Sequence, residues 1–289
     1  MLAIYLNVVV QGVLTGLLYG LMALGLSAIF GVVRVVNFAH GEFAVVAMYA
    51  AFVLFRVYGI DPMWAMLPIA VAFFVIGYAL QHTVIDAFVG RPDHEQFILL
   101  VGLAIVITNG LLLVFGPDAQ PANLPYAFDS VMVGPLIIDE VRVYAAVAAL
   151  AVCAALFAFF RFTRTGTAIR ACADNLVGAA VVGLNVRRLY ALTFGLGLAC
   201  VGAAGALMIT IADAVPSLGP AYTLLAFTIV IVGGLGSMTG ALVGGLLIGV
   251  SEALAGFLVA PSMKSMFSFA LLIAVLVLRP QGLLGKKPA

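Results

Sequence analysis

The sequence predicts an all-α polytopic membrane protein with eight or nine transmembrane helices, including broken or re-entrant segments. The first observation is composition: 65% of the 289 residues are hydrophobic, 9% are charged and the mean hydropathy is +1.26. Soluble domains contain about 45–50% apolar residues. The second observation is that the hydrophobic residues form repeated runs near the ~20 residues that a helix needs to cross a bilayer. Such runs indicate membrane-spanning helices, which satisfy their own backbone hydrogen bonds.

The hydrophobic segments lie at residues 6–30, 40–58, 63–85, 96–115, 143–160, 189–211, 222–235, 241–259 and 263–278. Two of them, 222–235 and 263–278, are short for a span, so either could be tilted, half-inserted or re-entrant. This leaves eight or nine crossings. No polar stretch is long enough for a separate soluble domain, so residues 1–289 are expected to form a single transmembrane domain.

The basic residues indicate how the chain is oriented. The polar segment 161–188 interrupts the hydrophobic runs and carries five of the 13 basic residues. If this segment is cytoplasmic, alternation of the spans places ten basic residues inside and three outside, which agrees with the positive-inside rule. The N-terminus is then outside and the C-terminus is cytoplasmic. A net charge of +1 indicates no nucleic-acid partner.

The largest external loop, residues 116–142, contains four prolines and four acidic residues. Proline restricts the backbone and disfavours helix. The loop is therefore either an ordered external cap that could meet a partner or a plain connector.

A first candidate site lies at Asn37, His40 and Glu42. An ionised carboxylate inside a bilayer costs about 3 kcal/mol on insertion scales, so Glu42 is expected to face a cavity or a partner, which Arg34 or His40 could supply. Asn37 could cap the following helix and place Glu42 in its first turn. The group either lines a translocation path or forms a cap and ion pair at the membrane interface.

A second candidate site is the glycine-rich segment 233–240. It lacks the Lys-Ser/Thr pair of a nucleotide-binding P-loop, and no strand precedes it. Glycines in membrane helices permit close packing or a break in the helix. One interpretation is a broken helix that lines the path, with Gly240, Gly244, Gly245 and Gly249 as a packing face; the other is tight packing alone. The path residues would be Gly233, Gly234, Gly236, Ser237 and Thr239.

A third candidate site is a helix within the cytoplasmic segment. Apolar or small residues recur there at helical spacing and predict one short apolar face, formed by Ile169, Cys172, Leu176, Ala179, Ala180 and Gly183. Gly183 and Asn185 would end this helix. It could dock in a groove on another protein or lie on lipid headgroups. The scarcity of large apolar residues favours docking.

The remaining ionisable residues indicate less. Glu252 lies within the eighth hydrophobic segment and is expected to face the bundle interior, as acidic residues in membranes do. His82 and His94 do not have the spacing of metal ligands, so no metal site is expected. The three cysteines are expected to be small buried side chains.

Four sequence blocks together resemble the permeases of branched-chain amino acid ABC importers. They are GLSAIFGVVRVVNFAHGEF, RTGTAIRACADNLVGAAVVGLNVRRLYALTF, IVGGLGSMTGALVGG and the terminal VLRPQGLLG. The resemblance extends over nearly the whole chain, in order and at the spacing of the family. It implies the ABC importer permease fold, with residues 1–289 as a single transmembrane permease domain.

The resemblance also implies a location and a set of partners. Such a permease lies in the bacterial inner membrane, here with a periplasmic N-terminus and a cytoplasmic C-terminus, and contacts membrane lipid. It pairs with a second, homologous permease, two cytoplasmic ABC ATPase subunits and a periplasmic solute-binding protein for Leu, Ile or Val. The ATPase subunits would bind ATP and Mg, so this chain would hold no cofactor and would not itself be an enzyme.

The resemblance further implies that a cytoplasmic helix, here about Gly166–Asn185, transmits ATP-driven motion. The wider ABC importer signature in this loop is Glu-Ala-Ala followed by a glycine. This chain has Gly178, Ala179 and Ala180 followed by Gly183, so the acid is missing from its usual place and Asp174 is the candidate to replace it. The expected coupling residues are Arg170, Asp174, Ala179, Ala180, Gly183 and Asn185.

The leading interpretation is a permease subunit that translocates branched-chain amino acids, or related amino acids and amides, delivered by a periplasmic binding protein. One alternative is a urea or short-amide ABC permease, because related permeases have closely similar blocks. A second is an ion-coupled secondary carrier that uses Glu42 and Glu252 as coupling carboxylates. The third is an intramembrane hydrolase with Ser237 and His40, although a nucleophile, a base and an orienting group would have to converge.

Overall fold

The computed structural model describes residues 2–127, 129–134 and 136–285. Within these residues, nine helices are long and apolar enough to cross a membrane. This is the upper value of the predicted count. The nine are α1 (Leu2–Val33), α2 (His40–Tyr58), α3 (Pro62–Thr83), α4 (Asp93–Phe115), α5 (Glu140–Phe162), α8 (Val186–Met208), α9 (Gly219–Gly233), α10 (Met238–Leu258) and α11 (Lys264–Leu278).

The two segments predicted to be short gain length from 3-10 turns that begin with proline. The turn η2 (Pro216–Leu218) precedes α9, and the turn η3 (Pro261–Met263) precedes α11. Each combined segment then reaches 18 residues, which is long enough to cross a membrane. Proline suits a first helical position because its fixed backbone angle is already helical and its missing N–H would be unpaired there.

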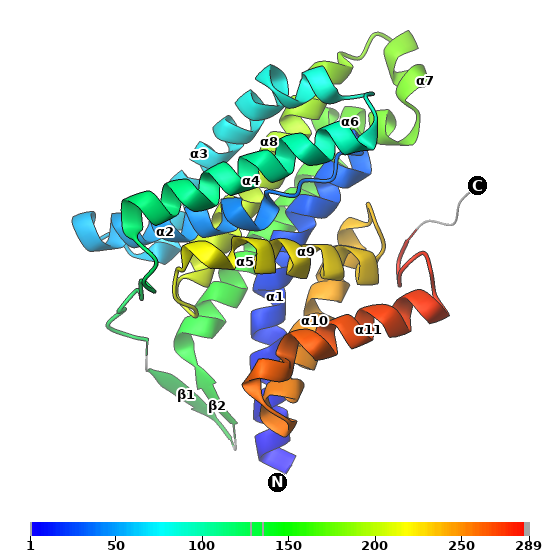
Figure 1. Cartoon of the computed structure of the whole chain (residues 1–289). Coiled ribbons are helices and arrows are strands. Elements are labelled where there is room, and N and C mark those ends of the chain that lie inside the picture. Colours follow the sequence, from blue (N-terminus) through cyan, green and yellow to red (C-terminus); the bar gives the residue numbers. More distant parts are fainter. Residues whose placement is uncertain (1, 128, 135, 286–289) are drawn as a thin grey trace.

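Helix α1 runs through the middle of the bundle and packs against α5, α8, α9 and α10 (Figure 1). Its contact with α10 is made backbone to backbone through glycines. A Cβ on Gly16 would lie 2.7 Å from the carbonyl oxygen of Gly245, and one on Gly249 would lie 2.5 Å from the Cα of Gly16. Of the predicted packing face, Gly245 and Gly249 therefore pack on α1, whereas Gly240 and Gly244 pack on Gly233 and Ile229 of α9.

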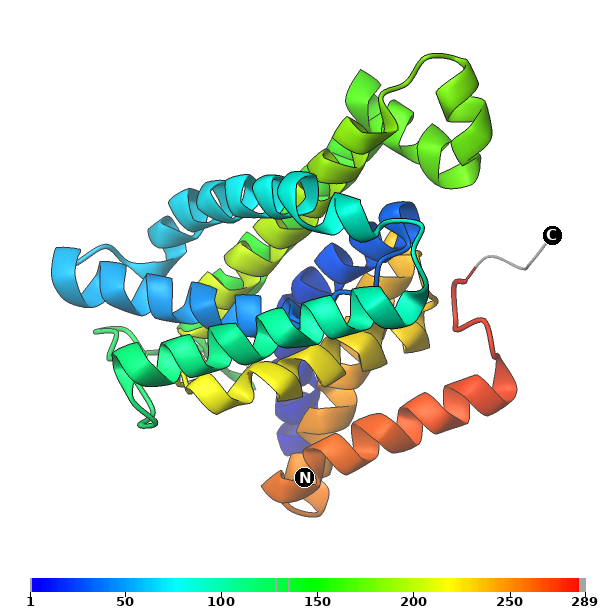
Figure 2. The ribbon, with the colours of Figure 1, turned by 45° about the horizontal axis from the view of Figure 1, so that its top comes forward.

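The chain segments at the two ends of the bundle differ in character. At one end lie the start of α1 and an antiparallel hairpin of β1 (Ser130–Val133) and β2 (Leu136–Asp139) (Figure 1). At the other end the segment between α5 and α8 projects away from the bundle (Figure 2). The polar segment 161–188 and the loop 116–142, which contains the hairpin, therefore lie at opposite ends of the bundle. Alternating spans require this arrangement.

The loop 116–142 is tied to the bundle at three places. The N–H of Ile137 donates to Asn7 (3.1 Å), Gln120 pairs with Ala214 in an isolated bridge, and the Tyr126 phenol donates to Asp61. Burial and this hydrogen bond raise the pKa of Tyr126. The described part of the loop is therefore ordered. Its contact with a partner stays a prediction.

The α1–α10 contact generates a test of packing. Replacing Gly249 by Ala should destabilise the protein, because backbone atoms on α1 block the new methyl group and overpacking typically costs about 1–3 kcal/mol. We expect the melting temperature of the detergent-solubilised protein to fall by several degrees. The matched control is Gly102→Ala on α4, where a Cβ meets nothing within 4 Å. Equal melting temperatures for the two variants would contradict this packing.

Candidate translocation and coupling sites

The polar segment 161–188 contains two short helices instead of the single one predicted. Helix α6 spans Arg164–Asp174 and α7 spans Leu176–Val181. The break is at Asn175, whose backbone is extended and whose Oδ1 accepts a hydrogen bond from the N–H of Gly178 (2.8 Å). Asparagine competes for backbone donors in this way and favours helix caps over helix interiors. The prediction of one helix over Gly166–Asn185 was therefore wrong at Asn175.

The predicted end of the helical segment is confirmed at Gly183, whereas Asn185 caps the start of the next helix. Gly183 has a φ of +83° and follows the last turn of α7. Its N–H donates to the carbonyl of Ala180, and the N–H of Leu184 donates to that of Ala179, both at 3.0 Å. This pair of bonds is the Schellman motif. Asn185 then caps α8 by accepting from the N–H of Arg188 (3.1 Å).

The inner face of α6 and α7 is apolar, as predicted, at Ile169, Cys172 and Ala179, which are buried. Burial raises the pKa of the Cys172 thiol, which agrees with a small packed side chain. Leu176, Ala180 and Gly183 were expected on the same face, but all three are exposed, and Leu176 is 47% exposed. The break at Asn175 accounts for this difference, because it changes the direction of the chain.

The outer face of this segment has a mixed character. Helix α7 and its end expose Leu176, Val177, Val181 and Val182. Sequence reasoning missed Val177, Val181 and Val182, because their spacing fits no continuous helix that includes α6. Of the predicted coupling residues, Ala179 is buried, and the exposed ones are Arg170, Asp174, Ala180, Gly183 and Asn185.

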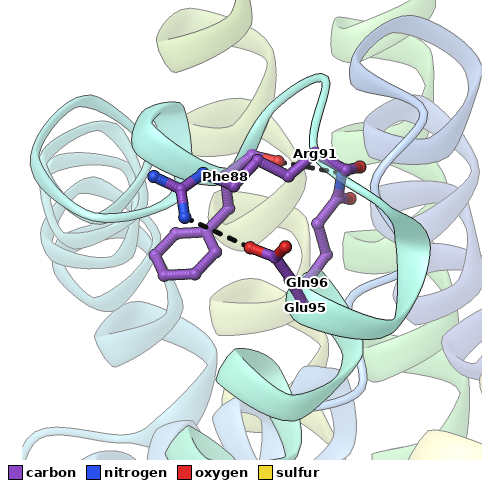
Figure 3. A network of polar contacts seen from close by, with 4 residues as sticks. All are labelled: Phe88, Arg91, Glu95 and Gln96. Carbon is purple, nitrogen blue, oxygen red and sulfur yellow. Dashed lines mark hydrogen bonds and ion pairs between the residues drawn. The ribbon is translucent and has the colours of Figure 1, made fainter.

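The base of this segment is linked to the loop between α3 and α4. The guanidinium Nε of Arg187 lies 3.4 Å from Asp86 Oδ2. Figure 3 shows how this loop is braced: Arg91 pairs with Glu95 (3.2 Å) and lies over the ring of Phe88. Gln96 Nε2 also donates to the Phe88 carbonyl (3.0 Å). Exposed ion pairs of this kind contribute at most about 1 kcal/mol each, so they orient the loop more than they stabilise it.

Residues 34–39, which connect α1 to α2, are not helical and return into the bundle. His40 Nε2–H donates to the Met22 carbonyl (2.9 Å). Given the rise of ~1.5 Å per helical residue, Met22 lies about 16 Å from the C-terminal end of α1. Helix α2 therefore starts within the membrane region. Non-helical backbone at this depth is tolerated where protein surrounds it, and Val35, Asn37 and Ala39 are buried.

Asn37, His40 and Glu42 lie inside this subunit. Asn37 Oδ1 accepts from the N–H of Ala39 (3.1 Å), and Ala39 is the residue that caps α2. The expectation that Asn37 caps the helix was thus wrong by two residues, although Glu42 does lie in the first turn. Among the described residues, Asn37 Nδ2 and His40 Nδ1 are buried without a hydrogen-bond partner.

The partner of Glu42 is Thr223 on α9, and the expected Arg34 or His40 does not fill this role. The Thr223 hydroxyl donates to Glu42 Oε2 (2.9 Å) and accepts from the N–H of Gly41 (2.8 Å). Arg34 instead points to the surface, where its backbone is left-handed with a φ of 58°. Glu42 is only 3% exposed, so this hydrogen bond joins α2 to α9 within the subunit.

The glycine-rich segment 233–240 forms the turn between α9 and α10. A Cβ on Gly233 would lie 2.1 Å from the Gly240 carbonyl oxygen, so the two helices meet backbone to backbone. Ser237 Oγ accepts from the N–H of Gly240 (3.1 Å) and caps α10, with the Thr239 hydroxyl at 3.3 Å.

The end of the described chain packs on this turn. Leu283 and Leu284 donate their N–H groups to the carbonyls of Val232 and Gly233, each at 2.9 Å. Gly234 and Gly236 have φ values of 109° and 74°, which glycine adopts without strain. The segment is thus a turn between two complete helices, and its role in a path stays a prediction.

Comparison with known proteins agrees with this architecture. Residues 8–276 match the family described as "Branched-chain amino acid transport system / permease component". The chain is 32% identical to the high-affinity branched-chain amino acid transport system permease protein LivH of Salmonella typhimurium, over 98% of this chain and 96% of that protein. It is also 32% identical, with the same coverage, to the permease protein BraD of Pseudomonas aeruginosa.

The fold is also found in a solved structure. PsaBC from Streptococcus pneumoniae in complex with Fab aligns with a TM-score of 0.51 at 13% identity, over 97% of each chain. At this identity the likeness concerns the fold alone. The family match and the full-length relatives carry the assignment, and the chain belongs to the permease components of branched-chain amino acid transport systems.

Proposed function

We propose that this chain is the membrane-spanning subunit of an ATP-driven importer that translocates branched-chain amino acids. Family membership carries the choice of solute class, because the relatives that match over their full length are named for this transport. The solute reaches the outer end of the bundle from a periplasmic binding protein. It passes between this subunit and a second permease, and two cytoplasmic ATPase subunits supply the energy.

The observation that carries the coupling role is the projecting pair of helices α6 and α7 (Figure 2). Exposed apolar side chains on a projecting helix lack a partner within the subunit and suit insertion into a groove on another protein. Valine at positions 177, 181 and 182 supplies this surface, and each is more than two-thirds exposed. The ATPase subunit docks on α7, with Arg170, Asp174 and Asn185 on its polar border.

The translocation path involves the junction of α2 with α9 and the turn before α10. Asn37, His40, Glu42, Gly233, Gly234, Gly236, Ser237 and Thr239 act here as gate residues. Because the first three are buried, they move with the helices and do not contact solute in this conformation. The Glu42–Thr223 hydrogen bond is the contact that a gating motion of α9 would break.

The docking surface predicts a selective loss of ATPase binding. Replacing Val181 by Asp places a charge at the centre of the apolar surface, so we expect at least a tenfold loss of ATPase subunits that co-purify with the permease. The matched control is Met132→Asp on the hairpin at the other end of the bundle, because Met132 is 74% exposed and Val181 is 81% exposed. Retention of the ATPase subunits by Val181→Asp would refute docking on α7.

The orientation is tested by thiol labelling in intact cells. The native cysteines at positions 153, 172 and 200 are buried and should react slowly with maleimides. Asn123→Cys on the hairpin side should react with a membrane-impermeant maleimide added outside. Ala180→Cys on α7 should react only after the membrane is permeabilised. The reverse pattern would place the N-terminus in the cytoplasm and would contradict the proposal.

The solute class is tested by transport. The complex purified from native membranes and reconstituted with its binding protein should import leucine, isoleucine and valine only when ATP is supplied to the ATPase side. The permease alone should neither hydrolyse ATP nor import leucine. Import of urea or acetamide in place of leucine would support the short-amide alternative. Uptake by the permease alone, driven by an ion gradient, would instead indicate a secondary carrier.

A further inference from the structure

Glu252 is a carboxylate at membrane depth that the subunit leaves partly exposed. It lies on α10 six residues before the final Leu258, or about 9 Å from that end of the helix. Contact with hydrocarbon would be costly for an ionised carboxylate, and such groups face protein or a water-filled cavity. Something other than lipid therefore covers Glu252 in the working importer.

Hydroxyl groups on the neighbouring helices hold Glu252 in place. The Ser268 hydroxyl on α11 donates to Glu252 Oε1 (2.9 Å), and the Tyr19 phenol on α1 interacts with the same carboxylate. Tyr222 on α9 also interacts with it electrostatically. Lys264 also interacts with it electrostatically, and the Lys264 side chain is exposed at the start of α11. A negative charge surrounded by hydroxyl groups can still attract a cation.

Polar groups connect Glu252 to the hairpin end of the bundle. Tyr19 interacts electrostatically with Arg142 as well as with Glu252, and Tyr222 interacts with Asp213 as well as with Glu252. Arg142 in turn donates to the Thr15 hydroxyl on α1 (3.0 Å). These side chains come from α1, α5, α9 and the loop that follows α8. They form a polar strip from the end of the bundle into its membrane-spanning part.

The strip begins at a cavity of about 330 Å³ on the hairpin end. Arg142 and Asp213 both line it, together with apolar side chains of Leu124, Val141 and Ile209. The Arg142 guanidinium is itself paired with Asp139 (2.9 Å). A cavity with charged lining residues at this end, followed by polar side chains and a partly exposed carboxylate deeper in the bundle, would suit the entry of a positively charged or zwitterionic solute.

We propose that Glu252 receives the α-ammonium group of the transported amino acid in the outer half of the translocation path. This inference rests on the proposed function, since the path and the outer side are defined by it. The other buried acid, Glu42, is unsuited to this role because Thr223 and the subunit interior enclose it. An ammonium group pairs with Glu252 more strongly than it would in water, because the surroundings have a low dielectric constant.

The test uses the complete importer in proteoliposomes with its binding protein. Glu252→Gln keeps the size of the side chain and its contact with Ser268 but removes the charge. We expect leucine uptake to fall at least tenfold, while ATP hydrolysis stimulated by the binding protein stays within twofold of the wild type. Uptake within twofold of the wild type would overturn the inference.

A second variant, Ser268→Ala, removes the hydrogen bond that orients Glu252 and leaves the charge in place. Uptake by this variant should fall less than uptake by Glu252→Gln, because the charge that attracts the ammonium group remains. A loss equal to that of Glu252→Gln would show that the carboxylate only anchors α11, and would overturn the inference. Loss of the second permease from purified Glu252→Gln complexes would assign Glu252 to the subunit interface. This result would also overturn the inference. Absence of leucine uptake by the wild-type importer would instead refute the proposed function, and this inference with it.

Discussion

The backbone contact between α1 and α10 is the constraint on which the rest of the bundle depends. Lipid is as apolar as leucine, so helices in a membrane associate through close packing rather than through the hydrophobic effect. Glycines at positions 12, 16, 245 and 249 bring the two backbones together. This contact holds α1 in the middle of the bundle. The helices α5, α8 and α9 then pack on the remaining sides of α1.

Those parts of the fold that depend on local composition could be predicted from the sequence, and those that depend on partners could not. Each hydrophobic segment matches an observed helix because length and apolarity alone determine a span. The end of the helical segment at Gly183 could also be predicted, since a glycine after a helix is a local signal. The partner of Glu42 could not be predicted, because Thr223 is 181 residues away and no local rule identifies it. The break at Asn175 was missed because apolar spacing was weighed above the capping tendency of asparagine.

Two acidic residues in the membrane show why burial alone does not indicate function. Glu42 and Glu252 both lie in hydrophobic segments, and the sequence offers no means to rank them. Within the subunit, Glu42 is enclosed and accepts from Thr223, so its energetic cost is offset by the fold itself. Glu252 is held by hydroxyl groups and stays partly exposed. These contacts offset part of its cost, and its exposed part leaves it able to respond to a partner or a solute.

Helix α8 provides a continuous connection between the projecting helices and the centre of the bundle. It begins at Val186, directly after the turn that ends α7, and packs against α1, α2 and α3. Its contacts are again close: a Cβ on Gly25 would lie 2.4 Å from the Gly197 carbonyl oxygen, and one on Gly205 would lie 2.4 Å from that of Ala44. Such tightly packed helices move as units, because their interface cannot deform gradually. A displacement of α7 by an ATPase subunit would therefore move α8 as a rigid element, and α8 would carry α1 and α2, the helices that hold Tyr19 and Glu42.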